Sequence, residues 1–331
     1  MSWLRYVLLL LIAVAGLLCI PEARATSCTA SATSLDFNSA NPADGSTTAT
    51  INYSCTSYFS TPGDRVAVSM CFAIGAGSAP STIADRKMTN EFGDPLSFQI
   101  YKDPAGSQVW GDSPGQPSYL TLEVEYPIFN IFGFGFGGTS GQIEIHGELA
   151  DLSQAASGTY RNTFSDARLI YNFRESRNPN TPKCGQGGGS TTNAFPFEAL
   201  VTVAPSCKVL AASDMDFSPN GALYAARTGN ITSSSVIELE CTKRTAWQVG
   251  LDNGLHFDGT YRQMCIGGSP CIRYRLTTQN GQPWGNTVDV NTVPGSSMGT
   301  PQTLTVNGSV TDQPLTLAGR YSDTVKVTLT Y

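Results

Sequence analysis

GRYSDTVKVTLTY, the stretch Gly319–Tyr331, alternates apolar and polar residues along most of its length. Successive side chains of an extended chain point to opposite faces, so Val325, Val327 and Leu329 fall on one face. IEIHGEL (Ile143–Leu149) has the same period of two. Helical periodicity is nearly absent, and Gly, Pro, Asn and Asp separate the alternating segments as turn residues do. The sequence therefore predicts an all-β chain of antiparallel strands.

The same stretch closes the second of two copies of one pattern. Five blocks recur in the same order: CTASATSLDF (28–37) with CKVLAASDMDF (207–217), INYSCT (51–56) with IELECT (237–242), RKMTNEFGDPLSFQIYKDPAGSQVWG (86–111) with RQMCIGGSPCIRYRLTTQNGQPWG (262–285), QIEIHGELA (142–150) with TLTVNGSVT (303–311), and GTYRNTFSDARLIYNF (158–173) with GRYSDTVKVTLTY (319–331). This duplication predicts two immunoglobulin-like antiparallel β-sandwich domains. The expected domains are residues 26–190 and 207–331, joined by a linker and strand over residues 191–206.

The amino terminus has the three parts of a secretory signal peptide. Arg5 precedes an apolar run from Tyr6 to Ile20, and Ala23-Arg24-Ala25 is a small-x-small cleavage site, so residues 1–25 are expected to be removed. An uncleaved membrane anchor is the alternative, although the run is short for one. The protein is therefore expected to be exported. Its net charge of −6 and scattered basic residues give no sign of nucleic-acid binding.

Eight cysteines follow the predicted signal peptide, and an even number in an exported chain indicates disulfide bonds. Cys28 and Cys55 occupy the positions of Cys207 and Cys241 in the repeat, so these form two predicted bridges. The remaining predicted pairs are Cys71–Cys184 and Cys265–Cys271. Zinc is the competing use of cysteine, but paired CxxC spacings and nearby histidines are missing.

FPFEALVTVAPSC (Phe195–Cys207) lies outside the repeated unit and after a Gly/Ser/Thr-rich linker. Its apolar residues recur at strict period two: Phe195, Phe197, Ala199, Val201 and Val203. An alternating strand on a flexible arm is suited to fill an open sheet edge by donor-strand complementation. The alternative is an ordinary first strand of the second domain.

The two copies differ in what precedes their first cysteine. Cleavage after Ala25 leaves no arm before Cys28, whereas the second copy has a strand before Cys207. The second copy stops on a strand at Tyr331, and its sandwich is either complete or open there. If the arm completes domain one and domain two is open, the chain accepts a strand but donates none. Such a subunit is expected at the end of a polymer.

These features resemble the spore coat protein U family, the fold of subunits in archaic (Csu-type) chaperone–usher pili. The shared motifs are a cysteine followed by an Asx-Phe pair (Asp36-Phe37 and Asp216-Phe217), the YSCT and LECT cysteines, the Trp-Gly turn, and the terminal motif Gly319–Tyr331. Domain one departs from the pattern at TYRNTFSDARLIYNF and in Cys71 and Cys184.

A two-domain member without an N-terminal donor strand resembles a pilus-tip adhesin. The resemblance implies transit through the periplasm to the cell surface, a periplasmic chaperone, an outer-membrane usher and an adjacent pilin subunit that donates a strand. It also implies attachment to surfaces, including hydrophobic ones, and biofilm formation.

YPIFNIFGFGFGGT (Tyr126–Thr139) is uncharged and mixes large apolar residues with glycine. It is an insertion in domain one relative to domain two, and an exposed apolar loop usually marks an interaction site. The expected surface-binding residues are Tyr126, Ile128, Phe129, Ile131, Phe132, Phe134 and Phe136. SYFSTPGD (Ser57–Asp64) is expected to bring Tyr58 and Phe59 to the same end. The alternative is a long hairpin whose aromatic side chains pack back on the sandwich.

Other functions have less support in the sequence. The two histidines, His146 and His256, belong to no recognisable catalytic motif, and the DNG and FDGT turns have too few carboxylates for a calcium loop. The sequence therefore predicts no enzyme activity, metal or cofactor. Two alternatives remain: a lectin or receptor-specific adhesin, with Trp110, Trp247, Trp284 and the tyrosines lining a sugar pocket, and a structural coat or matrix subunit.

Overall fold

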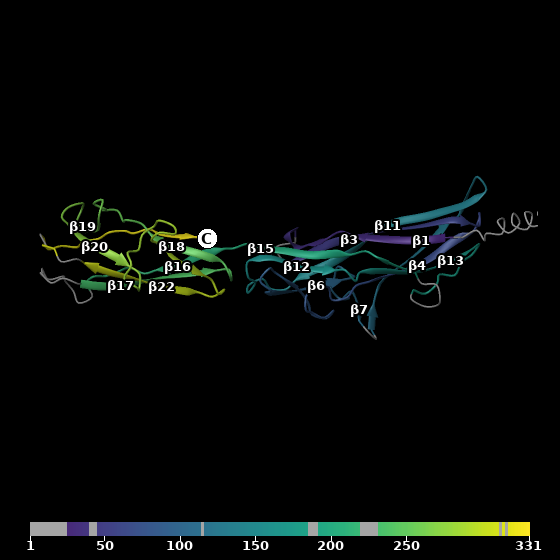
Figure 1. Cartoon of the computed structure of the whole chain (residues 1–331), viewed down its shortest axis with the longest axis horizontal. Helices are drawn as coiled ribbons and strands as arrows, with labels where there is room; N and C mark the ends of the chain where they lie inside the picture. The colour runs from purple at the N-terminus through teal and green to yellow at the C-terminus, as the bar shows by residue number, and fades with distance from the viewer. Residues whose placement is uncertain are drawn as a thin grey trace, which may run out of the picture. The chain divides into compact units, whose positions relative to one another are not determined.

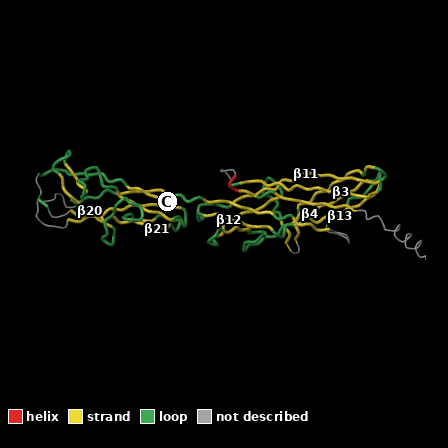
Figure 2. Tube along the Cα trace, turned by 45° about the horizontal axis from the view of Figure 1, so that its top comes forward, coloured by secondary structure: helices red, strands yellow, loops and turns green. Residues whose placement is uncertain are grey.

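The computed structural model describes residues 25–39, 45–113, 116–184, 191–218, 231–310, 313–314 and 317–331 (Figures 1 and 2). Residues 1–24, and with them nearly all of the predicted signal peptide, lie outside these ranges. In the described chain, the regular elements are strands apart from the 3-10 turn η1 (Phe37–Ser39), so the predicted all-β class is confirmed. Within the same ranges, no helix has the length and apolar character needed to cross a membrane.

The chain divides into two compact units. Unit 1 contains residues 1–89, 95–150 and 161–201, and unit 2 contains residues 90–94, 151–160 and 202–331. Most of the segment 191–206, expected as a linker and a donor-type strand, therefore belongs to unit 1. The strands over residues 158–164 and 197–203 reach into the ranges of unit 2 at residues 158–160 and 202–203, and below they are described whole with unit 1.

Unit 1 is built from two sheets, antiparallel except for the parallel pair β15–β2, and a small β7–β8 hairpin. The larger sheet has the order β1-β3-β11-β6-β5-β12-β15-β2, with β10 paired to β11, and the smaller has the order β14-β13-β4-β9. The strands are β1 (Ala25–Ala32), β2 (Leu35–Asp36), β3 (Ser46–Ser60), β4 (Arg65–Ala73), β5 (Arg86–Thr89), β6 (Pro95–Tyr101), β7 (Gly111–Ser113), β8 (Gln116–Ser118), β9 (Leu120–Pro127), β10 (Phe129–Ile131), β11 (Phe134–Leu149), β12 (Gly158–Phe164), β13 (Arg168–Ser176), β14 (Thr191–Ala194) and β15 (Phe197–Val203).

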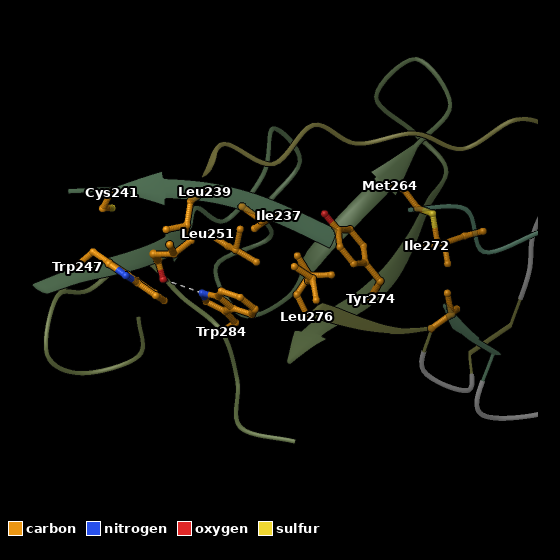
Figure 3. Close-up of a cluster of buried hydrophobic side chains, with 13 residues drawn as sticks. Ile237, Leu239, Cys241, Trp247, Leu251, Met264, Ile272, Tyr274, Leu276 and Trp284 are labelled. Atoms are coloured by element: carbon orange, nitrogen blue, oxygen red, sulfur yellow. Dashed lines mark hydrogen bonds between the residues drawn. The ribbon is translucent and has the colours of Figure 1, made fainter. Parts of the chain in front are cut away.

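Unit 2 repeats this plan with fewer strands. One sheet has the order β16-β17-β22-β20-β19 and the other has the order β21-β18-β23. The strands are β16 (Cys207–Ala212), β17 (Ile231–Cys241), β18 (Ala246–Leu251), β19 (Arg262–Cys265), β20 (Cys271–Thr277), β21 (Val293–Ser296), β22 (Gln302–Val310) and β23 (Val327–Thr330). Figure 3 shows the core between the sheets, where Leu239 of β17 and Leu276 of β20 belong to one cluster with Trp247 and Leu251 of β18.

An arginine, buried in unit 1 and half-buried in unit 2, holds the Trp-Gly turn in both units. In unit 1, Arg86 Nη2 donates to the carbonyl of Trp110 at 2.7 Å and to that of Gly75 at 2.8 Å. In unit 2, Arg262 Nη2 donates to the carbonyl of Trp284 at 2.9 Å. Burial lowers the pKa of Arg86 to about 10, so its side chain still carries its charge at neutral pH. The recurring Arg…Trp-Gly spacing thus marks a buried polar contact that satisfies turn carbonyls in each copy.

The last block of the repeat is equivalent residue by residue. Tyr160 donates its hydroxyl to the carbonyl of Ala156 at 2.9 Å, and Tyr321 donates to that of Leu317 at 2.8 Å. Arg161 pairs with Thr89 in the β12–β5 ladder, and Ser322 pairs with Cys265 in a β-bridge at the corresponding position of unit 2. Thus 160, 161 and 162 correspond to 321, 322 and 323.

Four disulfide bonds are present: Cys28–Cys55, Cys71–Cys184, Cys207–Cys241 and Cys265–Cys271. Cys28–Cys55 and Cys207–Cys241 are the two pairs expected from the repeat, and the other two are the pairs expected from the remaining cysteines. Cys28 lies opposite Cys55 in the β1–β3 ladder, and Cys207 lies opposite Cys241 in the β16–β17 ladder. Each of these two bonds therefore ties the first strand of a unit to its neighbour.

Candidate functional site

β15 fills the larger sheet of unit 1 between β12 and β2. It runs parallel to β2, with Ala199 opposite Leu35 and Leu200 opposite Asp36. Phe195, Phe197, Ala199 and Val201 are buried, while Val203 is half-buried. The period-two pattern of the sequence thus directs one face of the strand into the core.

Aromatic contacts fix β15 in unit 1. The ring of Phe197 stacks on that of Phe164 with centroids 4.8 Å apart, and on that of Trp110 at 6.2 Å. Phe195 meets Phe72 of the opposite sheet edge-on at 5.9 Å. The strand therefore contributes two large side chains to the space between the sheets, where aromatic pairs add to the free energy of burial.

Unit 2 has both backbone segments that would lie on either side of a strand in the position of β15, but no described strand lies between them. The Ser322–Cys265 bridge extends the sheet beyond β19, as β12 does beyond β5. The other flank is Met215–Asp216, which corresponds to Leu35–Asp36 of β2. The correspondence extends to contacts, because Ser218 N donates to Asp216 Oδ1 at 2.8 Å as Asn38 N donates to Asp36 Oδ1 at 2.9 Å. Among the described residues, no strand of unit 2 takes the position of β15.

Burial differs between the units at the side chains that flank this place. In unit 1 they are buried: Leu35, Phe37, Tyr160 and Phe164. Their counterparts in unit 2 pack against the core cluster but are only partly buried: Met215, Phe217, Tyr321 and Val325. Other core pairs are buried in both units, such as Met88/Met264 and Trp110/Trp284. The partly buried core residues of unit 2 thus include the four beside the position that β15 fills in unit 1, together with others such as Cys207, Val327 and Leu329.

The uncharged insertion of unit 1 forms a hairpin, β10–β11, with Phe129 opposite Phe136 and Ile131 opposite Phe134. Figure 1 shows this hairpin at the far end of β11. Phe132 and Gly133 make its turn with φ values of 52° and 88°. Asn130 Oδ1 accepts a hydrogen bond from Gly133 N at 2.9 Å and closes the turn. The expected loop is therefore an ordered two-residue β-turn.

The hairpin exposes most of its large side chains. Phe132 is 97% exposed and Phe129 is 62% exposed, and Ile131 and Phe134 are also exposed. Phe136 is half-buried. Tyr58 and Phe59 of β3 lie beside them, with Tyr58 against Phe136 at 5.9 Å and Phe59 against Phe134 at 5.7 Å between ring centroids. These seven residues, 58, 59, 129, 131, 132, 134 and 136, are called the apolar tip below.

Two residues expected in the apolar tip are buried instead. Tyr126 lies near the end of β9, which pairs with β4, and its hydroxyl lies 2.8 Å from Ser57 Oγ. Ile128 is held by its backbone, with its N–H 2.9 Å from the carbonyl of Asp64. Its side chain covers Gly135 and Gly137, where an added Cβ would come within 2.8 Å of it. Tyr126 and Ile128 therefore anchor the hairpin and are unsuited to contact a surface.

The sequence profile of the Spore Coat Protein U domain matches residues 15–165 and 193–328, which is most of the chain and both copies of the repeat. The chain belongs to this family. A search of curated protein sequences finds no match.

Among solved structures, this Spore Coat Protein U domain chain is similar to the CsuC–CsuE chaperone–tip adhesion subunit pre-assembly complex of Acinetobacter baumannii. The identity is 15% and the TM-score 0.43, over 92% of this chain and 100% of that chain. It is also similar to the CupB6 tip adhesin of Pseudomonas aeruginosa, at 12% identity and a TM-score of 0.36, over 91% of this chain and 93% of that chain.

The three tryptophans named for the alternative of a sugar pocket, Trp110, Trp247 and Trp284, are buried and so do not line one. Trp110 Nε1 donates to the carbonyl of Phe72 and Trp284 Nε1 to that of Val249, so both indoles are core residues with satisfied donors. A pocket of about 170 Å³ lies at the apolar tip between residues 59–62 and 133–135. It is smaller than typical ligand pockets.

The histidines lie in different units. His146 is half-buried on β11, and His256 Nδ1 lies 3.2 Å from Asp323 Oδ1. Asp323 also accepts the N–H of Leu255 at 2.9 Å, as Asn162 accepts that of Ser78 at 2.8 Å in unit 1. In the described part of the chain, no three His, Cys, Asp or Glu side chains gather as a metal site.

The sequence does not by itself assign a role to the residues that flank the strand position in unit 2, although they lie in motifs shared by the two copies. The Asx-Phe pair contains Phe217 and the terminal motif contains Tyr321 and Val325. These motifs align with residues of the first copy that are buried beside β15, and this alignment is the signal that could have identified them.

Proposed function

We propose that the chain is the tip subunit, an adhesin, of an archaic (Csu-type) chaperone–usher pilus. Unit 2 accepts a strand from the adjacent pilin subunit, and the apolar tip of unit 1 attaches to surfaces and supports biofilm formation. The observation that carries this proposal is the position of β15: it is filled within unit 1 and has only its two flanks in the described part of unit 2.

Strand addition suits these flanks physically. An incoming strand pairs with backbone groups on both sides and buries alternate side chains against Met215, Phe217, Tyr321 and Val325. An open apolar edge is prone to wrong pairing, so a periplasmic chaperone would protect it. An outer-membrane usher would then exchange the chaperone for the donor strand of the next subunit. Because β15 is engaged in unit 1, it is not available to a neighbouring subunit. That arrangement suits the end of a polymer.

The apolar tip supports the adhesive part of the proposal. Burying apolar area yields roughly 25 cal/mol per Å². Three or four side chains contributing on the order of 100 Å² each would give several kcal/mol before the costs of association. Such contact demands no particular stereochemistry from the target, so hydrophobic abiotic surfaces and lipids fit. Many pili on one cell would add avidity.

Immunogold electron microscopy of cells that assemble the pilus tests the position of the subunit. We expect label at fibre ends only. Label along the fibre length would favour the structural coat or matrix subunit. Competition distinguishes the adhesive modes: mild detergent should weaken adhesion to polystyrene, whereas inhibition by a soluble sugar would favour a lectin.

A further inference from the structure

Two contacts on the outer face of β12 match the polar residues of β15. Arg161 Nη1 lies 2.9 Å from Glu198 Oε2, and Thr159 Oγ1 lies 3.3 Å from Thr202 Oγ1. Glu198 and Thr202 alternate with the buried side chains of β15, so they lie on the face away from the core. The flank of the sheet therefore selects which polar residue the strand carries at each position.

In unit 2 the arginine lies at the position that corresponds to Thr159, and not at the one that corresponds to Arg161. The tyrosine contacts place Ser322 where unit 1 has Arg161, and Arg320 where unit 1 has Thr159. A strand in the position of β15 would thus meet a neutral serine at the site of Glu198. It would meet a guanidinium at the site of Thr202.

Arg320 is exposed, and among the described residues it makes no ion pair within 4 Å. Its charge nevertheless reaches Asp216 on the opposite flank. The pKa of Asp216 is lowered mainly by hydrogen bonds from Ser218, and Arg320 adds a smaller effect. Arg320 corresponds to Thr159, which faces Thr202 of β15, and this correspondence puts Arg320 beside the position of an incoming strand.

We propose that unit 2 selects its donor strand by charge, and that this strand carries a carboxylate opposite Arg320 and a neutral residue opposite Ser322. This inference rests on the proposed function and specifies the partner. The partner is an extended segment with alternating apolar residues. Its acidic residue lies at the position equivalent to Thr202 of β15, four residues after the position equivalent to Glu198.

The charge pattern of unit 2 also disfavours binding of the β15 segment from another molecule of this same chain. Its Glu198 would lie beside Ser322 and its Thr202 beside Arg320, so neither outer contact of unit 1 would form. Opposite charges in directly facing strands stabilise pairing, and their loss weakens it. Unit 2 is therefore suited to the strand of a different subunit.

Two labelled peptides test the inference on the full mature chain by fluorescence anisotropy at low ionic strength. One is FPFEALVTVA, residues 195–204. The other carries Glu198→Ser and Thr202→Glu, which moves the acid without changing the net charge. We expect the second peptide to bind up to about fivefold tighter, with a smaller difference at high salt because the pair is exposed.

Variants of the chain test the assignment of the charges. Arg320→Thr with Ser322→Arg restores the pattern of unit 1 and should reverse the preference between the peptides. Arg174→Ser, which removes an exposed arginine of β13 in unit 1, is the matched control and should leave the preference unchanged.

The outcomes separate the two proposals. Binding of neither peptide would overturn strand acceptance by unit 2, and with it this inference. Equal binding of both, or tighter binding of the unmodified peptide, would overturn the charge selection and leave strand acceptance standing.

Discussion

Phe132 occupies a position that favours asparagine or glycine. Its φ of 52° lies in the left-handed region, and Asn-Gly is the preferred pair for a turn of this kind. The ring is almost fully exposed, so neither backbone conformation nor burial explains the residue. The proposed contact of the apolar tip with a surface would explain it.

We expect Phe132→Asn to stabilise the hairpin and weaken adhesion. The turn loses backbone strain, so the free energy of unfolding should rise by about 0.5–1 kcal/mol, while the apolar tip loses its most exposed ring. Thermal melting and adhesion to polystyrene measure the two effects. A loss of stability in this variant would show that the Phe132 ring is structural.

Asp94 of unit 2 makes acid-sensitive ion pairs. Its side chain is 10% exposed, accepts from Arg244 Nε, and lies 3.1 Å from Lys243 Nζ. The hydrogen bond from Arg244 is the main reason that its pKa falls from 3.8 to about 2. Because the folded pKa lies below the unfolded one, this stabilisation is present above about pH 4 and is lost as pH falls towards 2.

Asp94→Asn should accordingly lower the Tm at pH 5 and leave it nearly unchanged at pH 2. Melting curves of wild type and variant at both pH values measure this. Asp85→Asn, at an exposed carboxylate, is the control and should have little effect at either pH. An equal loss at pH 5 and pH 2 would contradict a role for the charge.

The β10–β11 hairpin separates anchoring from adhesion along one segment. Phe129, Phe132 and Phe134 are exposed, whereas Ile128 packs under the glycines. We expect the triple change of these phenylalanines to serine to abolish adhesion while pili still assemble. Phe173→Ser, an exposed ring on β13 of the same unit, should retain adhesion. Full adhesion of the triple variant would remove the apolar tip from the proposal.

β15 is expected to be an integral part of unit 1. Phe197→Ala removes a ring stacked between Phe164 and Trp110 and should cost about 3–5 kcal/mol. Leu200→Ala, on the half-buried outer face of the same strand, should cost much less. Calorimetry should place the effect of Phe197→Ala in the transition of unit 1 alone. Similar effects of both changes would contradict the face assignment.

At the level of elements, the sequence predicts what depends on local pattern and repetition. The all-β class, the duplication and the proximity of Tyr58 and Phe59 to the insertion all follow from it. The burial of Tyr126 and Ile128 does not, because it depends on contacts with Ser57, Asp64 and two glycines that lie far apart in the chain or across the hairpin. The buried tryptophans were missed for the same reason: their N–H groups are satisfied by strands distant in sequence.

For the molecule as a whole, duplication gives two copies of one sheet plan with different roles. Unit 1 is completed by a strand of the same chain. Under the proposed function, the insertion is an adhesive hairpin and unit 2 keeps the same flanks for a strand of another chain. The polymer end and the surface contact would then belong to different units of one polypeptide.

Backbone hydrogen exchange tests the difference between the units most directly. The amides of Tyr321–Val325 should exchange faster than those of Tyr160–Phe164 in the free mature chain, because only the latter lie beside a described strand on both sides. Saturation with a β15-type peptide should slow the exchange of Tyr321–Val325 and leave Tyr160–Phe164 unchanged. Equal protection of both segments in the free chain, with no response to peptide, would contradict the account.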